Sequence, residues 1–168
     1  MERLWAPWRI KYISGQVGKP SDGGCVFCEA PEANDDVERL ILARGETTFT
    51  IMNLFPYTNG HLMVVPYRHV AVMSDLSADE HTEIMSASSV AVEVLGATMN
   101  CDGYNIGMNI GRAAGAGIDT HLHMHVVPRW NGDTNFMPVL NDTRIVSESL
   151  EDAYRKLKAE YDARNTTA

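Results

Sequence analysis

Three histidines stand two residues apart near the middle of the chain, at His121, His123 and His125. In a β-strand their rings would project from one face, while Leu122 and Met124 between them would project from the other. Packing alone does not explain three imidazoles in register. Because imidazole titrates near neutral pH, binds metal ions and can act as a nucleophile, we expect the chemistry of this protein at these residues.

Two kinds of chemistry fit the three histidines. In the first they bind a catalytic zinc ion, although strand geometry separates the first and third rings by about 13 Å, so one ion holds two of them at most. In the second, one imidazole is a nucleophile whose Nδ1–H is held by an acceptor, and a neighbouring His assists the leaving group. A loop rich in Gly and Ala at 111–117 offers backbone N–H groups that suit phosphate. This combination favours nucleotidyl transfer.

Cys25 and Cys28 form a second group with chemical potential, a C-x-x-C pair that supplies half of a tetrahedral zinc site. A pair of buried thiols and a disulfide are the alternatives. The chain has three cysteines, an odd number that argues against a secreted disulfide scaffold. We therefore expect a cytoplasmic protein, and Cys101 is expected to be a lone thiol.

The bulk composition excludes several classes of partner. The net charge of −8 argues against non-specific electrostatic binding of nucleic acid, because phosphate binding needs clustered Lys and Arg. The sequence has no run of 18 apolar residues and no apolar signal-peptide core near its start, so no membrane partner is expected.

The elements that must position these residues come in the order strands, one long helix, strands and a last helix. β-branched and apolar runs predict strands at 39–43, 47–54, 61–66 and 104–110, and a further strand through the three histidines. The dipeptide Asn59-Gly60 marks a hairpin turn. A capping box at Ser77 predicts a helix that ends near Asn100, and a last helix is expected at about 147–161. This order predicts an α+β fold with a mostly antiparallel sheet in a single domain.

Two motifs resemble a known family. Gly60-His61-Leu62-Met63-Val64-Val65-Pro66, followed by His121-Leu122-His123-Met124-His125-Val126-Val127-Pro128-Arg129, is similar to the pattern of the histidine triad (HIT) superfamily. The resemblance implies an HIT-like fold with one long helix and a C-terminal helix, and a sheet that extends across a homodimer. It divides the chain into an N-terminal arm at 1–24, an HIT domain at 25–140 and a C-terminal helix at 141–168 that packs on the same domain.

The resemblance also implies roles for individual residues. His123 is the nucleophile that becomes nucleotidylated, His125 contacts the phosphate and assists the leaving group, and His61 lies beside the nucleophile and helps to orient it. His121 supports the arrangement from the start of the strand. The nucleotide-binding positions are Asn53, which matches the family residue that bonds the ribose, and, on the phosphate side, Asn109, Gly115, Ala116 and Gly117.

The activity implied by the resemblance is the cleavage of purine nucleotides at the α-phosphate. Residues 4–9 (Leu-Trp-Ala-Pro-Trp-Arg) and 128–136 are similar to the branch that includes diadenosine tetraphosphate phosphorylases, with Fhit-like hydrolases as close relatives. We expect cleavage of diadenosine tetra- or triphosphate through a nucleotidyl-histidine, by hydrolysis or phosphorolysis. Residues 115–120 contain neither the Gln nor the Ser that positions substrate phosphates in many members. The alternatives are phosphoramidate hydrolysis, as in the Hint branch, and nucleotide binding with weak activity.

A structural zinc ion is also implied. Some bacterial members of the superfamily bind zinc through a C-x-x-C, a His shortly after the first motif, and the first His of the triad. In this chain those positions are Cys25, Cys28, His69 and His121. The ion would pin the N-terminal segment to the triad strand and commit His121 to the metal. Catalysis itself would need no cofactor, and a divalent metal ion accompanying the substrate is compatible with it.

Overall fold

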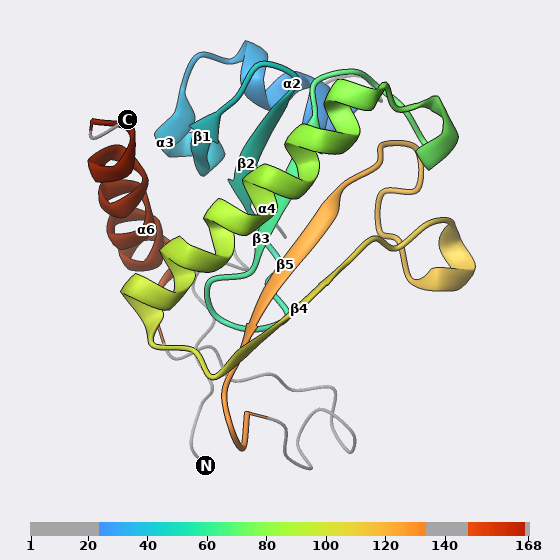
Figure 1. The fold of residues 1–168 in the computed structure, drawn as a ribbon. Coiled ribbons are helices and arrows are strands. Elements are labelled where there is room, and N and C mark those ends of the chain that lie inside the picture. Colours follow the sequence, from blue (N-terminus) through green and yellow to red (C-terminus); the bar gives the residue numbers. More distant parts are fainter. Residues whose placement is uncertain (1–23, 134–147, 167–168) are drawn as a thin grey trace, which may run out of the picture.

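The computed structural model describes residues 24–133 and 148–166 of the 168-residue chain (Figure 1). The expected N-terminal arm up to residue 23, the aromatic motif at 4–9 and residues 134–136 lie outside this part. The elements in chain order are α2 (Val26–Glu32), α3 (Asp36–Arg39), β1 (Ile41–Arg44), β2 (Thr48–Met52), β3 (Leu62–Pro66), the short 3-10 helix η2 (Met73–Asp75), α4 (Ala78–Met99), β4 (Gly103–Gly107), the 3-10 helix η3 (Arg112–Ala114), β5 (Met124–Arg129) and α6 (Leu150–Asn165).

The five strands form one sheet in the order β1-β2-β3-β5-β4, and every neighbouring pair is antiparallel. The predicted α+β fold is therefore confirmed. Gly60 ends the connection between β2 and β3 with a φ of +75°. This backbone conformation favours glycine, and a Cβ there would also displace the end of the Met99 side chain, whose Sδ would lie 2.3 Å away. His61 follows this glycine and stands directly before β3.

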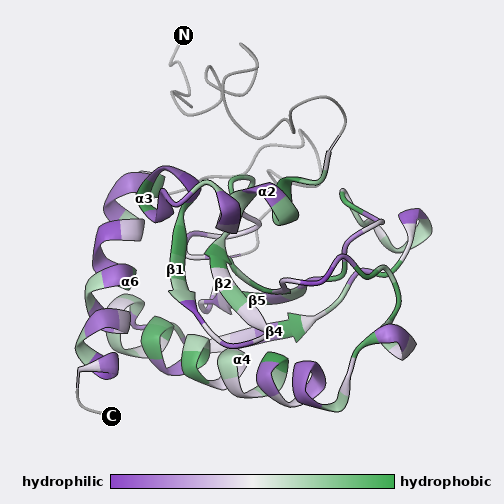
Figure 2. Ribbon diagram, turned by 90° about the horizontal axis from the view of Figure 1, so that it is seen from above, coloured by the Kyte–Doolittle hydropathy of each residue, from purple (hydrophilic) through white to green (hydrophobic). Residues whose placement is uncertain are grey.

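The two faces of the sheet carry separate cores. Leu62 packs with residues of α4 and α6 on one face, while Met63 packs with Phe27 and Ala30 of α2 on the other. Figure 2 shows α2 and α4 on opposite sides of the strands. Because His125 of β5 pairs directly with Met63 of β3, its side chain shares the face that α2 covers. The triad histidine in the sheet thus lies on the side away from α4.

Helix α4 begins and ends where local sequence signals predict. The Ser77 side chain accepts from the Glu80 backbone N–H and the Glu80 side chain accepts from the Ser77 N–H, which completes the capping box. Glu80 also pairs with Arg68, so the start of α4 is tied to the segment that follows β3. Asn100 closes the helix in the left-handed conformation. Among the described residues, no helix is both long and apolar enough to cross a membrane.

The structure differs from the predicted elements in several places. Helix α3 ends at Arg39, so the strand predicted from residue 39 begins at Ile41, and β4 ends at Gly107 although the predicted strand continued to residue 110. Helix α2 was not predicted, and α6 runs from Leu150 to Asn165 because Ser149, with Asp152 three residues later, caps its start. Strand β5 begins at Met124, so of the three histidines only His125 lies in the ladder. The physical reason is that the Leu122 N–H donates to the carbonyl of Val70, which draws the preceding backbone away from strand pairing.

Candidate functional site

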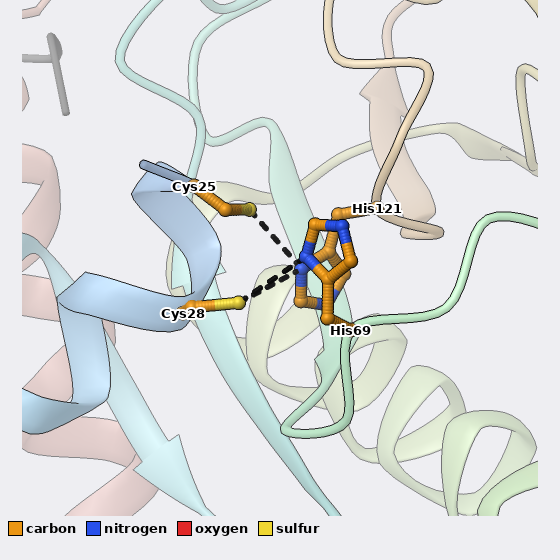
Figure 3. A group of neighbouring side chains, drawn as sticks. All are labelled: Cys25, Cys28, His69 and His121. Carbon is orange, nitrogen blue, oxygen red and sulfur yellow. Dashed lines mark hydrogen bonds between the residues drawn. The ribbon is translucent and has the colours of Figure 1, made fainter. Parts of the chain in front are cut away.

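Four possible metal ligands converge at one end of the sheet. The donor atoms of Cys25, Cys28, His69 and His121 all lie within 4.8 Å of one another. Figure 3 shows the two cysteines projecting from the start of α2 towards the two imidazoles. Cys25 Sγ lies 3.2 Å from His121 Nδ1, and Cys28 Sγ lies 3.3 Å from His69 Nδ1. The structure therefore assembles the ligand set that the resemblance implied.

The chemistry of this donor set fits zinc. His121 Nε2 lies 2.9 Å from the Pro66 carbonyl oxygen, which can only accept, so Nε2 carries the proton. Its Nδ1 lone pair then faces the two sulfurs, as a metal ligand requires. In the chain alone, burial and the neighbouring Cys25 raise the pKa of Cys28 to about 11. A divalent cation reverses that preference, so binding is coupled to the release of thiol protons.

His123 lies next to the cluster with its ring held in one tautomer. Its Nδ1 lies 2.8 Å from the carbonyl oxygen of His121, so Nδ1 donates and Nε2 keeps a lone pair. The side chain is buried. Burial lowers the pKa of His123 below its usual value, and the hydrogen bond to the carbonyl offsets part of that effect. The ring is therefore neutral at physiological pH and presents an unprotonated Nε2.

A backbone N–H fixes the tautomers of two further imidazoles, those of His61 and His125. The Tyr57 N–H donates to His61 Nδ1 at 3.1 Å, so the proton of His61 is on Nε2. That Nε2 lies 2.8 Å from His125 Nδ1, which must accept, and His125 therefore carries its own proton on Nε2. Burial, followed by the field of His123, lowers the pKa of His125 to about 4. His61 thus donates its Nε2–H to His125, which lies 64 residues later in the sequence. This hydrogen bond keeps His125 neutral, with an Nε2–H that can donate.

The side-chain amide of Asn109 lies beside His125, the last residue in this series of hydrogen bonds. Its Nδ2 is 3.4 Å from His125 Nε2 and 3.2 Å from Tyr57 Oη. Because His125 Nε2 carries a proton, turning the amide so that Oδ1 faces both groups satisfies all three hydrogen-bonding partners. Asn109 is therefore beside the atom of His125 that is available to a ligand.

Asn53 is a further predicted nucleotide-binding residue. Asn53 Oδ1 accepts from the Phe55 N–H at 2.9 Å, and Asn53 Nδ2 lies 3.3 Å from His61 Nδ1. Asn53 thus lies within hydrogen-bonding distance of His61, one of the histidines of the site. Its role at a ribose stays a prediction.

The Gly- and Ala-rich loop at 111–117 contains η3. The N–H of Gly115 donates to Arg112 O at 3.0 Å and that of Ala116 donates to Gly111 O at 3.4 Å. These two amides are engaged inside the loop itself. A Cβ added at Gly117 would meet nothing within 4 Å, so the loop borders open space. The phosphate role expected for these three residues stays a prediction.

Two aromatic residues of the site were not singled out from the sequence. The Tyr57 ring lies 4.5 Å from the His61 ring and 5.6 Å from the His125 ring. The Phe27 ring lies 4.9 Å from the His123 ring. Each has a signal that could have found it, because Tyr57 stands in the turn before the G-H motif and Phe27 stands between the two cysteines.

Comparison with known proteins gives consistent matches. A family model for the HIT domain matches residues 35–132. An AP-4-A phosphorylase of Mycobacterium tuberculosis is 37% identical over 166 residues, which cover 96% of this chain and 85% of that protein. An adenosine 5'-monophosphoramidase of Schizosaccharomyces pombe is 28% identical over 107 residues, covering 64% of this chain and 75% of that protein. The crystal structure of a Zn-bound histidine triad family protein from Mycobacterium smegmatis superposes with a TM-score of 0.69 at 27% identity, covering 86% of this chain and 98% of that one.

Proposed function

Because this chain belongs to the HIT domain family, we propose that it is an enzyme that cleaves dinucleoside polyphosphates, diadenosine tetra- or triphosphate, at the α-phosphate through a nucleotidyl intermediate on His123. The observation that carries the proposal is the tautomer of His123. Its Nδ1–H is fixed on the His121 carbonyl, so a neutral Nε2 is available for attack. The AP-4-A phosphorylase relative, matched over 96% of the chain, supports the substrate class.

The first step forms one bond and breaks one. His123 Nε2 attacks the α-phosphorus, and the bond between that phosphorus and the bridging oxygen breaks. The leaving polyphosphate oxygen departs as an anion and accepts a hydrogen bond from the His125 Nε2–H, the group that lies beside Asn109. His61 and the Tyr57 N–H keep His125 in the tautomer that can donate. In the second step water or phosphate attacks the nucleotidyl-histidine and releases AMP or ADP.

The separation of the two histidine groups supports this mechanism over a catalytic zinc ion. In the described part of the chain the ligand cluster includes His121, whereas His123 and His125 are not members of it. The proposed ion is therefore structural, held by Cys25, Cys28, His69 and His121. When bound, it joins the start of α2 to the segment before β5, and the Zn-bound Mycobacterium smegmatis relative supports its identity.

We further propose a cytoplasmic homodimer. Strand β4 is the outer strand of the sheet beside β5, and it exposes Ile106 while the segment after it exposes Ile110. An edge strand with exposed apolar side chains is suited to pairing with a second copy. The cytoplasm suits ligand cysteines that must stay reduced. Purine nucleotides are the proposed small-molecule partners, and the net charge of −8 disfavours nucleic acid.

Phosphoramidate hydrolysis is the second candidate. It is supported by the adenosine 5'-monophosphoramidase relative, which matches a shorter part of the chain at lower identity than the phosphorylase does. The same nucleophile would serve, with an amine as the leaving group. The two candidates are separated by comparing kcat/KM for diadenosine tetraphosphate and for an adenosine phosphoramidate.

Product analysis with and without inorganic phosphate tests the proposed function. Diadenosine tetraphosphate is expected to give ATP plus ADP when phosphate is the acceptor, and ATP plus AMP when water is. Labelled phosphate should appear in the ADP alone, since the incoming group bonds to the α-phosphorus of the adenylyl enzyme. Absence of turnover on dinucleoside polyphosphates under both conditions would contradict the proposal.

The pH profile of kcat/KM is a further prediction. Burial lowers the pKa of His123 and brings that of His125 to about 4, and a protonated His123 has no lone pair for attack. We therefore expect the acid limb, which reports protonation of His123, to lie below the usual imidazole value of about 6.5. Metal content should be measured at each pH, because ligand protonation also releases zinc. A break near pH 6.5 with the metal retained would contradict the assignment.

A further inference from the structure

Phe27 joins the two histidine groups of the site. It stands between Cys25 and Cys28, so it moves with the two sulfur ligands of the cluster. Its ring lies 5.5 Å from the His121 ring at 75° and 4.9 Å from the His123 ring at 49°. Phe27 is 4% exposed, so these contacts are made inside the protein and not on a solvent-exposed surface.

The helix that carries Phe27 depends on contacts outside itself. Helix α2 has seven residues and contains Pro31, and its N-cap Cys25 makes no side-chain capping bond. A helix this short is not stable alone, because nucleation costs more than so few hydrogen bonds return. Its position is instead set by the cysteines at the metal cluster and by the burial of Phe27 and Ala30.

The ring of His123 needs more than one restraint. The single hydrogen bond from Nδ1 to the His121 carbonyl fixes one nitrogen but leaves the ring free to tilt about that bond. The His125 ring lies 4.8 Å away at 77°, and the Phe27 ring lies at 4.9 Å. Together these two rings limit the direction in which His123 Nε2 points.

We propose that Phe27 is a positioning residue for His123, with the two cysteines of the metal cluster as its anchor. The proposal rests on the function proposed above, in which His123 is the nucleophile. It gives the cluster a consequence for catalysis beyond holding the chain together, because the same turn of helix that supplies two metal ligands also supplies one wall of the nucleophile's site.

A matched control is available in the same core. Phe49 of β2 belongs to the cluster of buried residues that contains Phe27, and its ring packs against that of Tyr67. Phe27→Leu and Phe49→Leu therefore remove the same group from the same core, and only the first removes a ring from His123. Phe27→Met is a second variant, whose unbranched and flexible side chain adapts better to the space left by the ring, should Phe27→Leu fold poorly.

The test compares these variants in the full-length, zinc-loaded protein. For Phe27→Leu we expect adenylyl-His123 to form about 10- to 100-fold more slowly in single-turnover experiments, with KM changed less than about 2-fold, as for loss of a residue that orients a reacting group. Long-range ¹H–¹⁵N spectra of the histidine rings should show loss of the single Nδ1–H tautomer of His123. Zinc content should stay at the wild-type level, and Phe49→Leu should leave both rate and spectrum unchanged.

Two outcomes would contradict the positioning role of Phe27, and a third would contradict the proposed function. A wild-type His123 spectrum together with a wild-type rate in both Phe27 variants would overturn the positioning role. So would an equal loss of rate and tautomer in Phe49→Leu, since the effect would then come from general loss of packing. If the wild-type protein forms no adduct on His123, the proposed function fails, while the ring spectra still decide whether Phe27 positions that side chain.

Discussion

Replacing His123 with alanine is expected to lower kcat on diadenosine tetraphosphate by roughly 10⁴-fold or more, the scale seen when a covalent nucleophile is removed. The reason is that Nε2 of His123 is the unprotonated imidazole nitrogen held beside the metal cluster, and alanine offers no atom to form the intermediate. The measurement is steady-state turnover with detection limits low enough to quantify the residual rate.

Two controls define what this loss means. His81 is an exposed histidine on α4, so His81→Ala should retain wild-type activity. Zinc content of His123→Ala should equal that of the wild type, because His123 is not a member of the ligand cluster. A variant that keeps activity within about 10-fold of wild type would rule out His123 as the nucleophile. Loss of zinc in His123→Ala with zinc retained in Cys25→Ala would instead favour the catalytic-zinc alternative.

Removal of the metal is expected to have the largest effect on stability. A ligand that binds only the folded state at about 1,000 times its Kd contributes about 4 kcal/mol. For a chain of this size that corresponds to a fall in Tm of roughly 8 to 16 °C on chelation. The fall is expected because the four ligands join the start of α2, the segment after β3 and the segment before β5. Thermal unfolding with and without a chelator measures it.

Cysteine variants distinguish the loss in Tm caused by loss of the metal from a general loss of stability. Cys28→Ser removes one ligand and should reproduce most of the loss in Tm, with zinc content reduced. Cys101 is the remaining cysteine, and its Sγ donates to the Leu95 carbonyl at the end of α4. Cys101→Ser keeps a donor there and should change Tm by less than about 2 °C, as expected for a nearly neutral exchange. Equal Tm values for wild type with and without chelator would contradict a structural metal.

Local signals account for the elements that the sequence predicted well. The capping box at Ser77 and the left-handed Asn100 both act within one helical turn, so α4 was delimited from a few residues. The turn that ends at Gly60 and the apolar run after it likewise predicted the antiparallel pair of β2 and β3. In each case the residues that decide the structure are neighbours in the sequence.

The parts that escaped prediction depend on partners far along the chain. Helix α2 contains Pro31 and is held by burial of Phe27, so its short sequence carries little helical signal of its own. The pairing of His61 with His125 follows from the register of β3 on β5, across 64 residues. Similarly, β5 begins after His123 because the Leu122 N–H bonds to a loop carbonyl instead of to a strand.

The intact mass of the protein after mixing with diadenosine tetraphosphate tests the central claim most directly. Rapid quenching under mildly alkaline conditions, followed by peptide mapping, is expected to show one adenylyl group per chain, on His123. The group should disappear on the timescale of turnover when phosphate or water is allowed to react. Turnover without any adduct, or an adduct on another residue such as His125, would contradict the account of His123 as the nucleophile.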